Sequence, residues 1–421
     1  LVGYRPGENA DLARRAAAAS AQALFTKSPG GALATAARVA RYRRLIDAAV
    51  RGTDIPPALL EGLVFLESAG RPDAVAGGSV DNAAGLTQIL PGTATSLLGL
   101  HVDLARSGPL LAAAQAAQSA GSAARAARLG AALAAADQRF DPARALLATV
   151  RYLELAQRDL GRLDLAVVAY HAGIGNVQQV LAKYDGGRPV SYEQLYFSSS
   201  PYDHAAAWMF LSSLGDDSSR YLWRVLESER LMQMYRAQPA ALRRLSGLEL
   251  SYPSDALTLL PSPVPTFAGP AALSAAYQSG TLVPLPSDAV RLHLAYAPDM
   301  GALAQRWRAP VALYRGLRPA ALDVLLKIAA VVHRVAGGAL TVTSTVLDRR
   351  YERSSGFFDP PGASGFTFQI LRPRRAAGQA QALQFVLDRL QALDVVGWIP
   401  GARTIEVTAA PDAAQVLRRG A

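Results

Sequence analysis

The segment 58–68 constrains the fold more than any other part of the chain, because it is apolar on nearly every side. Pro56 and Pro57 precede it, and proline is tolerated in the first turn of a helix. A helix without a polar face must be enclosed by other elements. Near its end stands Glu67, whose carboxyl is either buried, with a raised pKa suited to a general acid, or reaches solvent and has no chemical role.

The rest of the first half also has helical periodicity. With 421 residues the chain is too long for one hydrophobic core, so two or three domains are expected. Apolar residues recur at helical spacing, and glycine or proline separates the segments. The expected helices cover residues 11–24, 34–51, 58–68, 91–98, 142–160, 163–171, 176–183, 203–214 and 218–236, with one or two surface helices within 99–140.

The second half changes character. Residues 251–286 are rich in proline and serine, which predicts a linker or irregular strap. Helices are then expected at 320–336 and 377–393, and strands at 340–347, 365–371 and 404–408. We therefore predict a multidomain chain, with a mainly α domain followed by a small α+β domain. The expected limits are 1–40 for an N-terminal helical segment, 41–248 with an insertion at about 99–140, 249–312 for the linker, and 313–421.

Charge and composition limit the partners. The formal net charge is +10 and the pI about 10.0, which fits a solvated basic surface or attraction to an anionic cell wall. The basic residues are scattered rather than interleaved with aromatics, so nucleic acid is not an expected partner. The chain has no cysteine, which excludes disulfides and thiolate metal sites. No apolar run is long enough to span a bilayer, and the first residue, Leu1, suggests a processed or trimmed N-terminus.

Five short motifs follow one another in the first half. Glu67-Ser68 comes first, then GLTQILP at 85–91, FDP with RYL between 140 and 153, AYHAGIGNV at 169–177, and DSSRY at 217–221. Each motif is weak alone. In this order they resemble the soluble lytic transglycosylase family, over about residues 40–235.

The resemblance implies a goose-lysozyme-like fold with a deep groove for peptidoglycan glycan strands. It also implies cleavage between N-acetylmuramic acid and N-acetylglucosamine. Glu67 would protonate the glycosidic oxygen and then take the proton from the C6 hydroxyl of the same muramic acid, which attacks C1 and closes a 1,6-anhydro ring. The usual glycosidase needs two carboxylates, whereas here one suffices, and no cofactor or metal is implied.

The same resemblance assigns substrate-binding residues. It implies that Ser68 orients the Glu67 region or bonds an acetamido group, with a plain helix-end role as the alternative. It further implies that Tyr170 places its hydroxyl beside Glu67, with a core aromatic as the alternative, and that Tyr221 is a second such tyrosine. The remaining substrate-binding positions are Gln88, His171, Asp217 and Tyr221. The chain departs from the family pattern at Thr87, where methionine is usual, at His171, where asparagine is usual, and at Asp217, which is one methylene short.

A weaker resemblance covers about residues 313–408. This part is similar to zinc D-Ala-D-Ala carboxypeptidases, whose metal requires imidazole and carboxylate ligands. Gly362, Gln369 and Glu406 stand where those ligands are expected, and His293 and His333 lie outside the motif. We therefore expect a degenerate relative without metal or peptidase activity, which either binds wall peptide or docks on the first domain. An unrelated α+β domain is the alternative.

Two other functions stay open at this point. One is a true hydrolase of the goose-lysozyme type, and the other is a non-catalytic wall-binding scaffold. With any of the three functions, lytic transglycosylase, hydrolase or scaffold, we expect peptidoglycan to be the ligand. We also expect the protein to lie outside the cytoplasm, in the cell envelope or secreted. A peripheral wall or envelope protein is a candidate partner.

Overall fold

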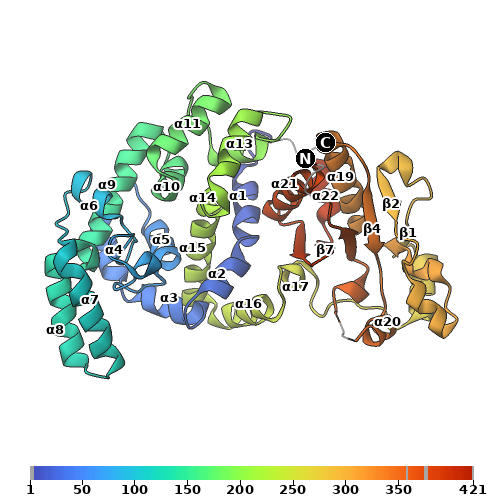
Figure 1. Cartoon of the computed structure of the whole chain (residues 1–421), viewed down its shortest axis with the longest axis horizontal. Coiled ribbons are helices and arrows are strands. Elements are labelled where there is room, and N and C mark those ends of the chain that lie inside the picture. Colours follow the sequence, from blue (N-terminus) through green and yellow to red (C-terminus); the bar gives the residue numbers. More distant parts are fainter. Residues whose placement is uncertain (1–3, 357–358, 374–377, 420–421) are drawn as a thin grey trace. The chain divides into compact units, whose positions relative to one another are not determined.

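The computed structural model describes residues 4–356, 359–373 and 378–419, which fold into two compact units (Figure 1). The α unit comprises Ala23–Leu195 and Ala206–Ser246, and the α+β unit comprises Leu1–Gln22, Tyr196–Ala205 and Gly247–Ala421. Residues 196–205 and 247–312 thus lie with the α+β unit. The domain limits that the sequence analysis expects at residues 41, 249 and 313 stay predictions.

The α unit is built from helices. Their bounds are α2 (Ala21–Lys27), α3 (Ala32–Ala40), α4 (Arg43–Ala49), α5 (Pro57–Ser68), α6 (Pro91–Ser96), α7 (Leu104–Ser119), α8 (Ala123–Ala136), α9 (Pro142–Leu160), α10 (Leu163–Ala172), α11 (Ile174–Asp185), α12 (Tyr192–Ser198), α13 (Ala205–Ser213), α14 (Gly215–Ser219), α15 (Tyr221–Ala237) and α16 (Pro239–Ser251). The helices at the two ends of this set extend into the other unit.

Helix α5 lies at the centre of the α unit, as its apolar sequence predicts. It packs against α15, α3 and α4, and Leu60, Leu63 and Val64 are fully buried. Gly62 allows α15 to come close, because a Cβ at this position would lie 2.7 Å from the carbonyl oxygen of Val225. A side chain here would force the two helices apart, which explains a glycine in a helix interior despite its cost.

The segment 99–140 forms a helical hairpin of α7 and α8, in agreement with the surface helices expected there. Leu111 and Leu133 of the hairpin join Val80, Ala84 and Phe140 in a small core of their own. Helix α9 begins as predicted, with the Asp141 side chain accepting hydrogen bonds from the first turn. The helix expected at 34–51 is interrupted after Ala40, so that α3 and α4 are separate.

The α+β unit has a five-stranded sheet with the order β2-β4-β5-β7-β6. Strands β2 and β4 are parallel, and the other neighbours are antiparallel. The strands are β1 (Val283–Pro284), β2 (Leu294–Tyr296), β3 (Gly316–Leu317), β4 (Leu340–Ser344), β5 (Thr367–Leu371), β6 (Val396–Pro400) and β7 (Thr404–Ala409), and the helices are α1 (Asn9–Ala18), α17 (Ala256–Leu259), α18 (Pro270–Gln278), α19 (Pro319–Ala336), α20 (Arg349–Ser354), α21 (Gln379–Ala392) and α22 (Ala413–Arg419). Helices α19 and α21 pack together beside the sheet.

Two parts of this unit differ from the sequence expectation. The proline-rich stretch contains α17, α18 and β1, and Pro270 occupies the first turn of α18, where its missing N–H costs nothing. Strand β6 was missed because Gly397 and Pro400 resemble a turn. Gly397 is needed there, since a Cβ would lie 2.9 Å from the amide nitrogen of Ala256.

The predicted fold class, a mainly α part followed by a small α+β part, is confirmed. Within the described residues, none of the helices combines the length and apolar character that crossing a bilayer requires.

Candidate active site

The end of α5 is fixed by contacts with α3. After Ser68 the chain turns through Ala69, whose φ of 53° is left-handed and ends the helix. Arg38 Nε donates to the Ala69 carbonyl oxygen over 2.8 Å. Gly70 lies against α3, where a Cβ would come within 2.9 Å of the Val39 amide nitrogen. The last turn, which carries Glu67, is therefore held in one place.

Glu67 is held by a tyrosine and has no cationic partner. The Tyr221 hydroxyl donates a hydrogen bond to Glu67 Oε1, and in the described part of the chain no arginine, lysine or histidine forms an ion pair with this carboxylate. Burial raises the pKa of Glu67 to about 7, although the Tyr221 hydrogen bond acts in the opposite direction. A carboxyl with such a pKa keeps its proton near neutral pH.

Two other glutamates show what distinguishes Glu67. Glu61, on the same helix, is 1% exposed and pairs with Arg236 over 2.8 Å and with Arg43 over 3.4 Å. Glu229 has a pKa raised to about 7 by burial and by the nearby Glu61 charge, but it lines neither of the hollows described next. The raised pKa is therefore shared with Glu229, and what singles out Glu67 is its position in the wall of both hollows.

Glu67 lies where two hollows meet. The charged hollow has a volume of about 210 Å³ and the neutral hollow about 490 Å³, and Glu67 and His171 line both. The remaining walls of the charged hollow are Ala23, Leu24, Lys27, Ser28, Phe65, Leu66, Ala69, Asp217, Tyr221 and Arg224. Those of the neutral hollow are Ala76, Ala83, Gln88, Ile89, Leu90, Thr93, Leu98, Tyr152, Tyr170, Ala172 and Gly173.

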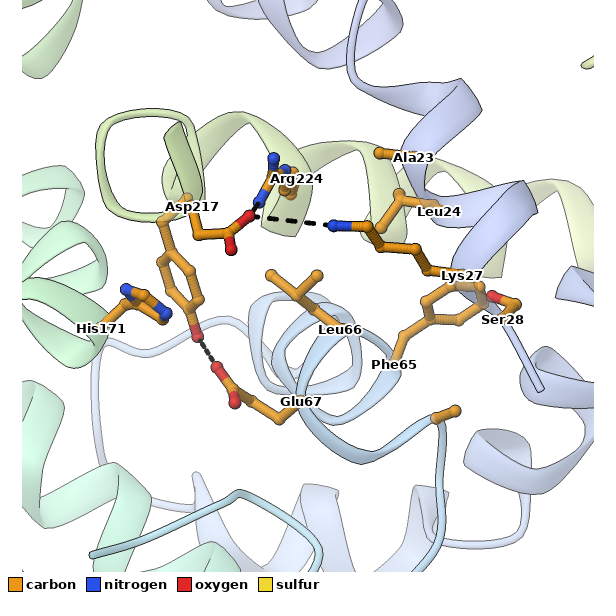
Figure 2. Close-up of a pocket in the computed structure, with 12 residues that line it drawn as sticks. Ala23, Leu24, Lys27, Ser28, Phe65, Leu66, Glu67, His171, Asp217 and Arg224 are labelled. Atoms are coloured by element: carbon orange, nitrogen blue, oxygen red, sulfur yellow. Dashed lines mark hydrogen bonds and ion pairs between the residues drawn. The ribbon is translucent and has the colours of Figure 1, made fainter. Parts of the chain in front are cut away.

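The charged hollow takes its name from three side chains. In Figure 2, dashed lines join Asp217 to Arg224 and to Lys27, while Glu67 lies apart from these three. Asp217 pairs with Arg224 and lies 4.0 Å from Lys27 Nζ. The hydrogen bond from Arg224 is the main cause that lowers the pKa of Asp217. The carboxylate of Asp217 is therefore ionised at neutral pH, where Glu67, with a pKa of about 7, is about half protonated.

His171 lines both hollows, as Glu67 does. Its imidazole stacks on the Tyr221 ring with centroids 5.0 Å apart, and Nδ1 lies 3.0 Å from Ser218 Oγ. Burial lowers the pKa of His171, and the charge of Asp217 only partly opposes this effect. A neutral imidazole is consequently expected at pH 7, which can donate or accept a hydrogen bond without adding charge next to Glu67.

Of the two tyrosines that the resemblance implied beside Glu67, Tyr221 makes the hydrogen bond and Tyr170 does not. The Tyr170 hydroxyl donates to the Thr87 carbonyl oxygen over 2.7 Å and lies 3.2 Å from Thr149 Oγ1. It is Tyr221 that contacts Glu67 directly. Tyr170 instead lines the neutral hollow and ties α10 to the loop before α6, while Tyr152 meets its ring edge-on.

Gln88 presents an acceptor to the neutral hollow. Both hydrogens of its side-chain amide are used, because Nε2 donates to the carbonyl oxygens of Ala74 over 3.0 Å and of Gly85 over 2.9 Å. The side-chain carbonyl oxygen of Gln88 stays available to a ligand. It can accept a hydrogen bond from a sugar hydroxyl or from an acetamido N–H. The backbone of Gln88 has a φ of 50°, an uncommon conformation for this residue.

Ser68 lines neither hollow. Its side chain is 2% exposed, and its hydroxyl donates to the Val64 carbonyl oxygen over 3.3 Å. This favours the helix-end alternative over contact with an acetamido group.

Sequence reasoning missed Lys27, Arg224 and Tyr152 as lining residues. Tyr221 and Arg224 are three residues apart and so share a helix face, which is the signal that points to Arg224; no comparable signal marks Lys27.

Two of the three positions that the weaker resemblance compared with zinc ligands, Gln369 and Glu406, lie together in the α+β unit. Gln369 and Glu406 face each other across β5 and β7, and Gln369 Nε2 donates to Glu406 Oε2 over 3.0 Å. Tyr252 Oη lies 2.9 Å from Glu406 Oε1 and 2.8 Å from Asp359 Oδ1. A Cβ on Gly362 would meet Glu352 Oε1 at 2.2 Å. Among the described residues, no group of three or more His, Cys, Asp or Glu side chains is arranged to hold a metal ion.

Comparison with known proteins supports the α unit as the catalytic part. Residues 115–189 match the family model of the transglycosylase SLT domain, which confirms the family resemblance that the motifs predicted. The match contains Tyr170 and His171, whereas Glu67, Gln88 and Tyr221 lie outside it. No curated protein matches the chain. The match supports a lysozyme-like domain of the transglycosylase type, acting on peptidoglycan.

Proposed function

We propose that the α unit is a peptidoglycan lytic transglycosylase in which Glu67 is the single general acid and base. The observation that carries the proposal is the place of Glu67, a carboxyl with a raised pKa at the junction of two hollows. A polymer that runs through both hollows passes directly over this carboxyl. Cleavage there leaves sugars bound on either side, which is the arrangement required for cutting a glycan strand.

The reaction proceeds in two steps. In the first, protonated Glu67 gives its proton to the glycosidic oxygen, and the bond from C1 of N-acetylmuramic acid to that oxygen breaks. In the second, the Glu67 carboxylate takes the proton of the C6 hydroxyl, whose oxygen bonds to C1. The product is a 1,6-anhydro sugar, and Glu67 is again protonated. The tyrosine hydroxyl on Oε1 holds the carboxyl in orientation during both steps.

The hydrolase alternative has one structural point in its favour. Asp217 is the only other carboxylate among the described residues that line the hollows, and its lowered pKa suits a base that activates water. Its pairing with Arg224 and its proximity to Lys27 assign it to binding in our proposal. The products distinguish the two reactions, because anhydro ends lack one water relative to reducing ends.

The test is digestion of purified sacculi by the whole chain, followed by mass spectrometry of the released fragments. We expect anhydro-terminated fragments from the wild type and none from Glu67→Gln, which keeps the size and polarity of the side chain. Fragments with reducing ends would establish the hydrolase instead. Unchanged digestion by Glu67→Gln would overturn the role of Glu67, and no digestion by the folded wild type would favour the wall-binding scaffold. With this substrate, we also propose that the protein acts outside the cytoplasm, in the cell envelope or secreted.

A further inference from the structure

One wall of the neutral hollow is a loop that has little regular structure of its own. Residues 69–90 join α5 to α6, and Ala76, Ala83, Gln88, Ile89 and Leu90 from this loop line the hollow. Its regular structure is limited to one 3₁₀ turn, Ala76–Gly78, and to isolated bridges and turns, such as the mutual hydrogen bonds of Ala84 and Ile89 at 3.1 Å. A loop with so few regular backbone pairs depends in addition on contacts from other elements.

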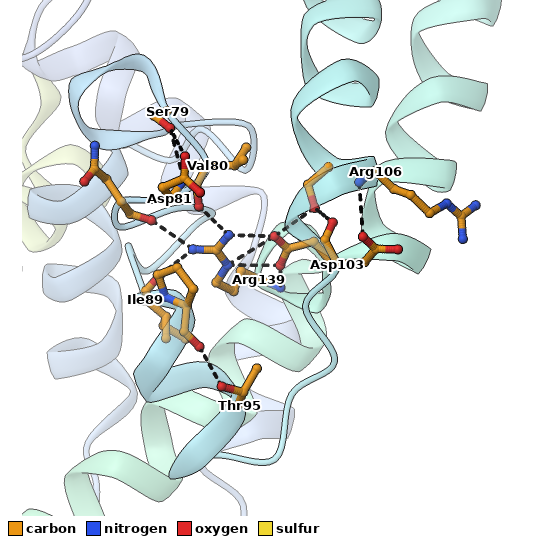
Figure 3. A network of polar contacts seen from close by, with 12 residues as sticks. Ser79, Val80, Asp81, Ile89, Thr95, Asp103, Arg106 and Arg139 are labelled. Carbon is orange, nitrogen blue, oxygen red and sulfur yellow. Dashed lines mark hydrogen bonds and ion pairs between the residues drawn. The ribbon is translucent and has the colours of Figure 1, made fainter.

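The Arg139 guanidinium lies under this loop (Figure 3). Nη1 donates to the carbonyl oxygens of Asn82 over 2.9 Å and of Ile89 over 3.2 Å, and Nη2 donates to that of Val80 over 2.7 Å. Nε and Nη2 also bind the two carboxylate oxygens of Asp137 over 3.0 and 2.7 Å. All five N–H donors of the guanidinium are therefore used.

Both members of this ion pair are fully buried, which makes the network sensitive to change. Arg139 and Asp137 are each 0% exposed. Removal of the guanidinium takes a donor from three loop carbonyls and leaves the buried Asp137 carboxylate with only the Ser107 hydroxyl and the Arg139 backbone amide. Buried polar groups that lose their partners are costly. The backbone is equally close, since a Cβ on Gly85 would lie 1.8 Å from the Arg139 carbonyl oxygen.

The contacts of Arg139 extend to Gln88, whose side chain lines the neutral hollow. Gln88 Nε2 donates to the Gly85 carbonyl oxygen, and Gly85 rests on the Arg139 backbone. On the other side, Asp137 follows α8, and Ser107 Oγ of α7 lies 3.3 Å from Asp137 Oδ2. The α7–α8 hairpin is thus connected to Gln88 through a continuous set of buried contacts.

We propose that Arg139 is a positioning residue for Gln88, and that the α7–α8 hairpin with the Asp137–Arg139 pair is the support of the groove wall rather than an added module. Arg139 does not touch the ligand; it sets the carbonyl oxygen of Gln88 where a sugar on the neutral side of Glu67 donates to it. The identity of this ligand rests on the proposed function, whereas the support of the loop does not.

The first test is independent of activity. Hydrogen–deuterium exchange of the whole chain is compared for the wild type and Arg139→Lys, which keeps the charge beside Asp137 but loses the planar fork. We expect exchange of amides in residues 74–90 to become at least tenfold faster, with α10 unchanged. The matched control is Arg236→Lys. Arg236 is also paired with a buried carboxylate, that of Glu61, and neither of these two residues lines a hollow. Unchanged exchange in the loop would overturn the proposal.

The second test asks whether Arg139 acts through Gln88. Affinity for tetra-N-acetylchitotetraose is measured by calorimetry in the Glu67→Gln background, for Arg139→Lys, Gln88→Ala and the double variant. We expect each single change to weaken binding about fivefold to tenfold, as for one hydrogen bond, and the double variant to be no weaker than Gln88→Ala. Effects that multiply would show independent actions and refute the positioning role. If the saccharide does not bind any protein and sacculi are not digested, the proposed function fails, while loop exchange still decides whether Arg139 supports the wall.

Discussion

The Tyr221 hydroxyl donates to Oε1 of Glu67, while the ring of the same tyrosine stacks on His171. The hydrogen bond stabilises the charged form of Glu67, and burial stabilises the neutral form more strongly, which leaves the pKa at about 7. The balance between these two effects sets the pH range over which Glu67 can act as an acid.

For the wild type, we expect kcat/KM on sacculi to fall above pH 7. The free enzyme must hold the proton that it gives to the glycosidic oxygen, and the protonated fraction decreases about tenfold per pH unit above the pKa of Glu67. Below pH 7 this group does not limit the rate. The rate of fragment release between pH 5 and 9 checks this, and a rate that rises steadily up to pH 9 contradicts an acid role for Glu67.

Tyr221→Phe removes the hydroxyl and keeps the ring on His171. A hydrogen bond to a charged group contributes about 1.5–3 kcal/mol, so the pKa of Glu67 should rise by about one to two units. We expect the alkaline limb of the pH profile to move upwards by that amount, with a rate at pH 6 about tenfold lower because the carboxyl is less well oriented. A profile that keeps its midpoint would mean that the hydroxyl does not act on Glu67.

Glu67→Gln should stabilise the fold above pH 7. The pKa of Glu67 is raised from 4.5 to about 7, so the unfolded chain ionises first and the folded protein loses stability as pH rises from 4.5 to 7. Above pH 7 the full penalty, at most about 3 kcal/mol, is present. Thermal unfolding at pH 8 should show a higher Tm for the variant, and the two proteins should agree at pH 4. Equal Tm values at both pH values would count against the burial of the charge.

Thr87→Val should also stabilise the protein, without changing activity. Thr87 is fully buried, and its Oγ1 has no hydrogen-bond partner in the described structure. Tyr170 binds the Thr87 carbonyl oxygen, which valine retains. Removing an unpaired buried hydroxyl should raise the free energy of unfolding by about 1 kcal/mol.

The matched control for this change is Thr149→Val. The Thr149 hydroxyl is paired, since Oγ1 donates to the Ala145 carbonyl oxygen over 2.9 Å and lies 3.2 Å from the Tyr170 hydroxyl. We expect denaturant unfolding to show the opposite sign, a loss of about 1 kcal/mol. If both valine variants shift stability in the same direction, pairing of the hydroxyl is not the cause.

Asp359→Asn tests the polar cluster of the α+β unit. Burial and the Glu406 charge raise the pKa of Asp359 from 3.8 to about 6, so the folded state loses stability as pH rises from 3.8 to 6. The amide should remove this loss and raise the free energy of unfolding at pH 8 by about 1–2 kcal/mol. Denaturant unfolding at pH 4 and pH 8 measures it. Asp323→Asn, on the exposed side of α19, is the control and should change neither value.

The sequence predicted the α helices best where their burial is uniform. The apolar segment that ends at Glu67 became α5, because only an enclosed position satisfies it. The break after Ala40 and the strand β6 were not predicted, since each depends on contacts with distant residues. Gly397, for example, is explained by the amide of Ala256, which lies far away in the sequence.

The candidate site was predicted unevenly for a similar reason. Motif order pointed to Glu67, Tyr221 and His171, and the structure brings these three together. It could not tell which tyrosine contacts the carboxyl, because helical spacing fixes a face but not a distance. Arg139 carried no signal at all, since its function depends on carbonyl groups of a loop about fifty residues earlier.

The meeting of two hollows at one carboxyl also has a consequence for how such a protein can change. Helix α2 and α15 build the charged side, while the loop 69–90 and α10 build the neutral side. Residues on either side can change their contacts with a ligand while the Glu67 carboxyl, which α5 carries, stays in its position. Substitutions in either hollow can therefore change which glycan strands are preferred, by length or by substituents, in nature or in the laboratory. The proposed bond-breaking step would stay the same.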